Sequence, residues 1–212
     1  MTQQAGHSPG IKAAIFDLDG VIFDSAEANV AFYNHLLEVL GLPPMDEASR
    51  PVVHSACLDD SLLHLTGDPE LVQRAKDYFR SLDPTPFLAK LRTFPHAVET
   101  IRSLAERLRL AVATNRMDTT HRALAHVGLT GAFEVVITPN QAGATKPDPR
   151  VMAVTLQRLG LERDQVVYIG DSEIDDQLCR AAGVRLVAFR NPSLQAWAHL
   201  EDFRDLPPLL GL

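Results

Sequence analysis

Two aspartates two residues apart, Asp17 and Asp19, directly follow an apolar run, and Gly20 comes at once after them. Two carboxylates held this close repel each other, so a fold tolerates them when a cation lies between them or when they share a proton. An Asx-type turn after a strand explains the same residues, because Asp and Gly are ordinary turn formers. The pair alone leaves both interpretations open.

Other side chains that could do chemistry also lie at the ends of apolar runs or just before an expected helix. Singly each is weak, because a Thr after a strand is usually a cap and a Lys before Pro is usually solvated. The carboxyl ends of parallel strands lie at one edge of a sheet, however, so we expect these side chains to meet Asp17 and Asp19 there. They are Thr114, Asn115, Lys146, Asp171 and Asp175.

Together these residues predict a metal site that handles phosphate. Several carboxylates need a hard cation, and Mg²⁺ accepts a few carboxylate or carbonyl oxygens together with water and substrate phosphate. The ammonium of Lys146 and the hydroxyl of Thr114 offer the positive charge and the donor that phosphoryl oxygens require. Neither Cys57 nor Cys179 ends a strand, and no Ser-His-Asp set occupies comparable positions, so the nucleophile is expected to be Asp17.

The elements that must position these residues follow from the hydrophobic pattern. The run at residues 13–16 is typical of a strand buried on both faces. Residues 25–92 have helical periodicity without a convincing strand, and from residue 93 helix and strand alternate, which predicts an α/β fold with a doubly wound parallel sheet. Strands are expected at 110–113, 133–137, 166–169 and 184–189, helices at 96–108, 118–127, 147–159 and 173–182, and a partly helical tail at 193–212.

This pattern predicts two domains. Residues 1–24 and 93–212 form the catalytic core, and residues 25–92 form an all-helical cap inserted after the first strand. The insertion point lies over the edge of the sheet where ligands bind, so a cap joined by two crossings could open and close over a site. An inert decoration is the alternative.

Composition excludes several function classes. The 212 residues carry a formal charge of −7 with a pI near 5.6, and no Lys/Arg-rich block, which argues against nucleic acid and anionic membrane partners. Residues 1–10 are a polar tail without a secretory pattern, and no apolar run reaches membrane-spanning length. We therefore expect a cytoplasmic protein with two reduced thiols and a small-molecule partner, while the oligomeric state stays open.

Residues 17–21, 114–115, 146–147 and 170–175 resemble, in order and spacing, the four signature motifs of the haloacid dehalogenase-like (HAD) hydrolase superfamily. The flanking residues look like the branch that contains phosphoglycolate phosphatase and β-phosphoglucomutase. The resemblance extends from residue 11 to about 189 and is weakest in the insert. It implies a Rossmann-like core with an inserted helical cap.

The resemblance also implies roles for single residues. Asp17 would attack phosphorus and become an aspartyl phosphate, while Asp19 would protonate the leaving oxygen and then activate water. Mg²⁺ would be held by the Asp17 carboxylate, the Asp19 backbone carbonyl and Asp171, with Asp175 in or near the next shell of contacts. The phosphoryl oxygens would be held by Thr114, Lys146 and the amide of Asn115.

These features favour a Mg²⁺-dependent phosphatase acting on a small phosphorylated metabolite. Dehalogenation is disfavoured because dehalogenating relatives do not keep an acid at the position of Asp19. A β-phosphoglucomutase-type phosphosugar mutase is an alternative, but Asn29 stands where that pattern has a histidine, and the next cap loop is apolar and acidic. A phosphate-sensing module without turnover is a third hypothesis.

The cap and one strand end offer further candidate binding residues. In the cap these are Arg50, His54 and His64, for which packing or surface roles are the alternative. Arg116 either reaches the substrate or the cap, or is solvated at the start of a helix.

Overall fold

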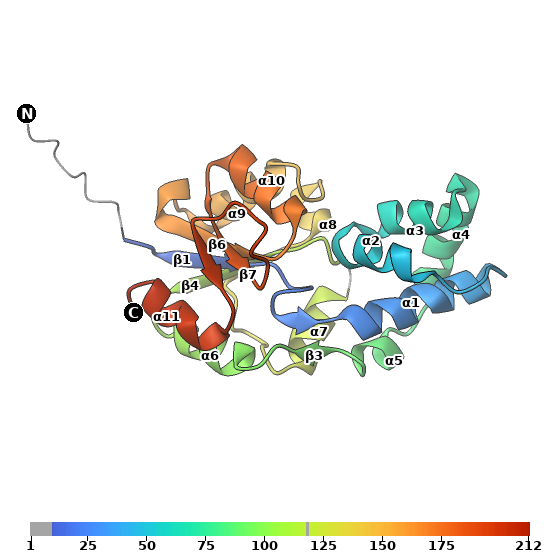
Figure 1. The fold of residues 1–212 in the computed structure, drawn as a ribbon, viewed down its shortest axis with the longest axis horizontal. Helices are drawn as coiled ribbons and strands as arrows, with labels where there is room; N and C mark the ends of the chain where they lie inside the picture. The colour runs from blue at the N-terminus through green and yellow to red at the C-terminus, as the bar shows by residue number, and fades with distance from the viewer. Residues whose placement is uncertain (1–9, 118) are drawn as a thin grey trace, which may run out of the picture.

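The computed structural model describes residues 10–117 and 119–212 of the chain. Residues 1–9 of the expected tail and Asp118, the expected first residue of a helix, lie outside the described residues. The structure has a sheet with helices on both faces, and a helical cap stands beside one end of the sheet (Figure 1). None of the described helices is both long and apolar enough to cross a bilayer.

Six parallel strands form the main sheet, in the order β5-β4-β1-β6-β7-β8. β1 is central, with β4 on one side and β6 on the other, so both of its edges are hydrogen-bonded. The strand bounds are β1 Ala13–Phe16, β4 Arg109–Ala113, β5 Val135–Ile137, β6 Val166–Gly170, β7 Arg185–Phe189 and β8 Ala198–Leu200.

Alternate residues of the sheet pack into two hydrophobic clusters, one on each face. Ala14 and Phe16 of β1 belong to the cluster covered by α6, α7 and α11, whereas Ala13 and Ile15 belong to the cluster covered by α9 and α10. All four side chains are 0% exposed, so β1 is apolar throughout because it has no solvent face. The helix bounds are α6 Ala97–Ala105, α7 Thr120–His126, α8 Pro139–Ala142, α9 Arg150–Leu159, α10 Glu173–Ala182 and α11 Leu206–Leu209.

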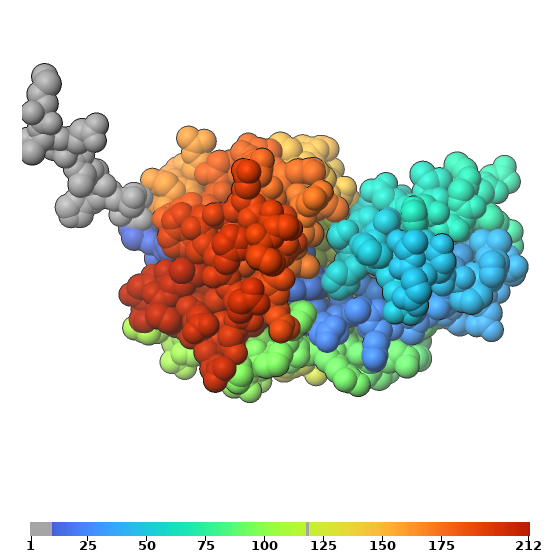
Figure 2. Space-filling view, viewed as in Figure 1, coloured from blue at the N-terminus to red at the C-terminus, as the bar shows by residue number. Residues whose placement is uncertain are grey.

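The cap has its own small core. Five α-helices lie within the described residues 25–92. Buried side chains of the first four form a third hydrophobic cluster around Tyr33, Leu36 and Leu62, whereas Leu88 of the fifth packs into the cluster of the core. The cap forms a second lobe that packs against the core (Figure 2). The cap helices are α1 Ala26–Val39, α2 Arg50–Ser55, α3 Leu58–Thr66, α4 Pro69–Phe79 and α5 Thr85–Leu88.

A two-stranded antiparallel ribbon joins the lobes. β2 (Phe23–Asp24) leads into the cap and β3 (Arg92–Thr93) leads out of it, and the two strands pair with each other. Both chain crossings therefore run side by side, so the polypeptide passes between the lobes at a single place.

The predicted fold class is confirmed: the structure is a Rossmann-like parallel sheet with a helical cap. The tail at residues 193–212 contains helix, as expected, at residues 203–209, but it also contains a strand that was not expected. Residues Ala198–Leu200 form the sixth strand of the sheet, and Phe203 and Leu206 are 0% exposed in the core beneath it. This segment is structural because it completes one edge of the sheet and covers one face.

Phe16 provides a test of how much the central strand contributes to stability. Its ring is fully buried and packs edge-on against Phe133, with ring centroids 6.0 Å apart. We expect Phe16→Ala to lower the free energy of unfolding by about 3–5 kcal/mol, because it leaves a cavity in a rigid core. The matched change Val39→Ala, at a side chain 42% exposed, should alter it by no more than about 0.5 kcal/mol. Urea unfolding measures both, and equal effects would contradict this account of the core.

Candidate active site

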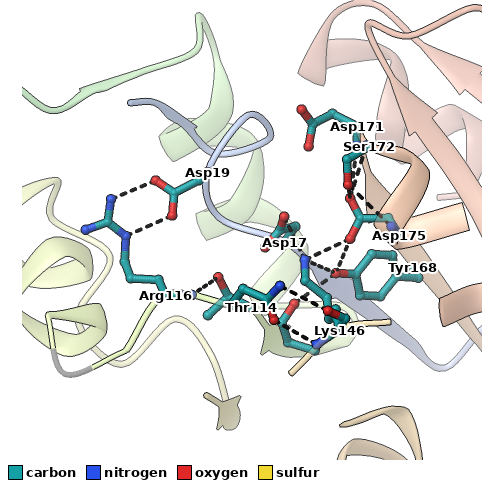
Figure 3. Close-up of polar contacts among 11 residues, drawn as sticks. Asp17, Asp19, Thr114, Arg116, Lys146, Tyr168, Asp171, Ser172 and Asp175 are labelled. Carbon is teal, nitrogen blue, oxygen red and sulfur yellow. Dashed lines mark hydrogen bonds and ion pairs between the residues drawn. The ribbon is translucent and has the colours of Figure 1, made fainter. Parts of the chain in front are cut away.

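Three neighbouring strands end in residues predicted to do chemistry. Asp17 follows β1, Thr114 follows β4 and Asp171 follows β6, and these strands lie side by side in the sheet. Their side chains gather at one edge of the sheet, beneath the cap (Figure 3). The convergence follows from parallel pairing, which aligns the carboxyl ends of all three strands.

A buried ammonium group holds two of the aspartates. Nζ of Lys146 lies 2.8 Å from Oδ2 of Asp17 and 2.8 Å from Oδ1 of Asp175, and it donates to the hydroxyl of Tyr168 at 3.0 Å. The Lys146 side chain is 2% exposed. Burial opposes its charge, but the two carboxylates raise the pKa of Lys146 above its usual range, so it stays protonated.

Asn115 fixes the backbone of this lysine. Its side-chain oxygen accepts from the Lys146 N–H at 2.7 Å, and its Nδ2 donates to the Lys146 carbonyl at 3.2 Å. The Asn115 amide group thus ties the end of β4 to the segment that carries the ammonium. Its predicted contact with phosphate stays a prediction.

Asp175 is fully engaged at the start of α10. Its Oδ1 faces Lys146 and Tyr168, and its Oδ2 accepts from the backbone of Asp171 and from the Ser172 hydroxyl at 2.7 Å. Ser172 caps the helix in return, by accepting from the Asp175 N–H. Burial would raise the pKa of Asp175, but Lys146 and these donors lower it below its usual range, so it is a fixed anion.

Three carboxylates approach one another closely. One oxygen each from Asp17, Asp171 and Asp175 lies within 4.8 Å of the other two. Burial raises the pKa of Asp171 to about 8, with help from the neighbouring charges of Asp17 and Asp175. Burial also raises the pKa of Asp17 to about 6, where the charge of Asp175 adds to it and Lys146 offsets it. The cluster is therefore electrostatically strained as a set of anions.

The donor set fits a hard divalent cation. Oδ1 of Asp17 is buried and has no hydrogen-bond partner among the described residues, which is costly unless another group binds it. A Cβ added at Gly20 would lie 2.1 Å from Oδ2 of Asp171, so the glycine leaves room for that carboxylate beside the turn. Oxygen ligands of this number and charge are typical of Mg²⁺ or Ca²⁺ sites.

Asp19 points away from the cluster, toward Arg116 (Figure 3). Arg116 donates to both carboxylate oxygens of Asp19, from Nη2 at 2.7 Å and from Nε at 2.9 Å. Burial alone would raise the pKa of Asp19, but the Arg116 guanidinium lowers it below its ordinary range. The acid is thus held as an anion in a bidentate pair, at a position separate from the three clustered carboxylates.

Several of these contacts were not predicted from the sequence. Arg116 is neither solvated nor free, because its side chain is 13% exposed and bound to Asp19. Tyr168 lies within an apolar strand, so no sequence pattern indicated that its hydroxyl would reach Lys146. Asn191 follows β7 and donates to the Asp171 carbonyl at 2.7 Å. Its place after a strand was the one available clue.

A pocket opens between this edge of the sheet and the cap. Asp17, Asp19, Thr114, Asn115 and Arg116 line its core side, and helices α1, α2, α4 and α5 contribute to its cap side. Of the three candidate residues in the cap, only His54 lines this pocket. Arg50 pairs with Glu47 at 2.7 Å, and His64 shares a hydrogen bond with Ser49 at 3.1 Å.

The sequence matches the family model described as haloacid dehalogenase-like hydrolase over residues 14–189. The phosphoglycolate phosphatase of Rhodospirillum rubrum is 33% identical, over 94% of this chain and 91% of its own length. That of Rhodobacter capsulatus is also 33% identical, over 94% of this chain and 95% of its own length.

Solved structures show the same relationship. A HAD-superfamily hydrolase of subfamily IA from Geobacter sulfurreducens has a TM-score of 0.83 at 30% identity, covering 94% of this chain and 100% of that one. The β-phosphoglucomutase of Clostridium difficile has a TM-score of 0.77 at 16% identity, covering 92% and 93%, and shares the fold. The chain therefore belongs to the haloacid dehalogenase-like hydrolases and is a phosphatase-like enzyme of that family.

Proposed function

We propose that the protein is a Mg²⁺-dependent phosphatase that hydrolyses a small phosphate monoester through an aspartyl phosphate on Asp17. The observation that carries the proposal is the state of the Asp17 carboxylate. Oδ2 is held by Lys146 at 2.8 Å, while Oδ1 is buried without a hydrogen-bond partner among the described residues, and the side chain lines the pocket. An oriented, partly desolvated carboxylate of this kind is suited to nucleophilic attack.

In the first step a carboxylate oxygen of Asp17 attacks phosphorus in line, and the bond between phosphorus and the ester oxygen breaks. Asp19 gives its proton to the departing alcohol. In the second step Asp19 takes a proton from water, the water oxygen attacks phosphorus, and Asp17 is released with inorganic phosphate. Because Arg116 holds Asp19 as an anion, Asp19 must leave this pair to carry the proton.

The remaining residues would stabilise charge on the phosphoryl oxygens. Lys146 supplies a fixed positive charge next to Asp17, and Thr114 supplies a hydroxyl at the end of the adjacent strand. Mg²⁺ would be held by the carboxylates of Asp17 and Asp171 and by the Asp19 backbone carbonyl, and it would neutralise charge on the phosphate. Asp175 would lie in or near the next shell of contacts around the metal.

The cap is proposed to be a separate unit with the bounds expected from the sequence, residues 25–92, inserted into a core of residues 1–24 and 93–212. Its own hydrophobic cluster and the paired crossings β2 and β3 support this division. The mutase alternative is less well supported. Of the described residues that line the pocket, Arg116 is the only Lys or Arg, which is too little charge for a second phosphate.

The nucleophile and the metal can be tested together. We expect the wild type to hydrolyse p-nitrophenyl phosphate with Mg²⁺ and to lose this activity in EDTA. Asp17→Asn should lower kcat by roughly 10⁴-fold or more, because the amide cannot form the intermediate. The matched control is Asp59→Asn, at a carboxylate on cap helix α3 that pairs with Lys76. Full activity of Asp17→Asn, or of the wild type in EDTA, would contradict the mechanism.

The two roles of Asp19 predict a trapped intermediate. In Asp19→Asn the attack by Asp17 on p-nitrophenyl phosphate should persist, since this leaving group needs little protonation, whereas water activation should fail. Intact-mass measurements should then find one added phosphoryl group. They should find none on the double variant with Asp17→Asn. Steady turnover by Asp19→Asn at the wild-type rate would exclude Asp19 as the base.

The pKa values predict how Mg²⁺ and pH act on stability. The pKa of Asp171 is about 8 and that of Asp17 about 6, both above the ordinary 3.8, so the folded metal-free protein binds more protons than the unfolded chain. Metal-free stability should therefore fall as pH rises toward 8, and Mg²⁺ should raise Tm more at about pH 8.5 than at about pH 5. Thermal melts of the wild type and of Asp171→Asn, with and without Mg²⁺ at the two pH values, measure this change in Tm. An equal Mg²⁺ effect at both pH values would refute it.

A further inference from the structure

The two walls of the pocket differ in chemistry. The core wall carries the polar groups of the proposed reaction. The cap wall is largely apolar, and three half-buried aromatic rings contribute to it. Phe32 of α1 packs edge-on against Phe79 at 5.4 Å and against Phe87 at 5.5 Å between ring centroids. Leu88 and Leu91 also line the pocket, and both belong to the hydrophobic cluster of the core.

The charge on the pocket walls is unfavourable to an anionic leaving group. Among the described residues that line the pocket, Arg116 is the only Lys or Arg, and Asp19 already neutralises it through two hydrogen bonds. Asp17 and Asp19 are both acidic. While Arg116 is paired with Asp19, as it is in the structure, a carboxylate on the departing alcohol would meet these acids and find no uncommitted guanidinium or ammonium group among the described residues that line the pocket. The phenol of Tyr33 adds no charge, because burial raises its pKa to about 12.

The polar side chains of the cap wall can recognise a neutral group. His54 and Asn29 line the pocket, and Nδ1 of His54 is buried without a hydrogen-bond partner among the described residues. Lys90 and Arg50 line an adjoining hollow that shares Asn29, Val53 and His54 with the pocket, and Arg50 is paired with Glu47. An anionic end of a longer substrate that reached this hollow could find a cation there.

We propose that the alcohol released by this enzyme is uncharged and presents an apolar, ring-sized surface to the Phe32, Phe79 and Phe87 wall. The inference rests on the proposed phosphatase function and narrows it to a substrate class. It separates this chain from its relatives named phosphoglycolate phosphatase, since glycolate is a small carboxylate.

Binding of two phosphonates tests the inference without requiring turnover. Benzylphosphonate carries a ring and phosphonoacetate carries a carboxylate, and both present the same phosphonate to the site. With Mg²⁺ present, we expect calorimetry on the wild type to give benzylphosphonate at least about tenfold tighter binding, from burial of the ring. Equal affinity, or tighter binding of phosphonoacetate, would overturn the proposal.

Variants of one cap residue locate the effect. Phe87→Arg should reduce the preference for benzylphosphonate by about tenfold or more, since it removes apolar surface and adds a cation. Phe87→Ala should lower it without any new charge, which keeps the test valid if the arginine variant does not fold. The matched control is Leu63→Arg on α3, at a side chain 46% exposed and outside the pocket lining, which should leave the preference unchanged.

Two further outcomes separate the hypotheses. If the wild type binds benzylphosphonate preferentially but hydrolyses neither acetyl phosphate nor p-nitrophenyl phosphate, the proposed function fails, and only the preference of the pocket for an apolar ring over a carboxylate stands. If phosphonoacetate is preferred and Lys90→Ala removes that preference, the adjoining hollow binds the leaving group and the inference is wrong.

Discussion

The buried ammonium of Lys146 is the interaction on which the site depends. It is a full charge in the protein interior, and its contacts with Asp17, Asp175 and Tyr168 offset the cost of removing it from water. These partners come from β6, from α10 and from the residue after β1. Loss of any one contact would leave a buried charge without full compensation. The same arrangement orients the proposed nucleophile, so stability and chemistry share one set of bonds.

Much of the site could be predicted because its residues are fixed by the backbone. Asp17, Thr114 and Asp171 each follow a strand, and parallel pairing then brings them together without knowledge of any side-chain rotamer. The bond between Asp19 and Arg116 could not be predicted in this way. The direction of a long side chain depends on what packs around it, and the sequence leaves Arg116 equally able to face solvent. The contact of the Tyr168 phenol with Lys146 could not be predicted either, because it also depends on the direction in which a long side chain packs.

The fold, like the site, could be predicted only in part. Apolar strands between amphipathic helices gave the doubly wound sheet, but β8 was missed. Its three residues, Ala198–Leu200, lie at the edge of the sheet with His199 exposed, so they lack the continuous apolar run that marks the central strands. The cap was predicted as helical from periodicity alone. The aromatic wall of the pocket was not predicted, because Phe32 is far in sequence from Phe79 and Phe87 and meets them only through the packing of α1 against α4 and α5.

The central place of β1 has a consequence for how the chain is made. Ala13 pairs with Arg109 on one side and with Val166 on the other. β1 therefore leaves the ribosome well before β6 and gains its second neighbour only after β6 has been synthesised. Until then an entirely apolar strand has unpaired edges, and such edges favour association with other chains. Long-range pairing of this kind also slows folding. A chaperone that prevents association with other chains would therefore help this protein most while its synthesis is still in progress.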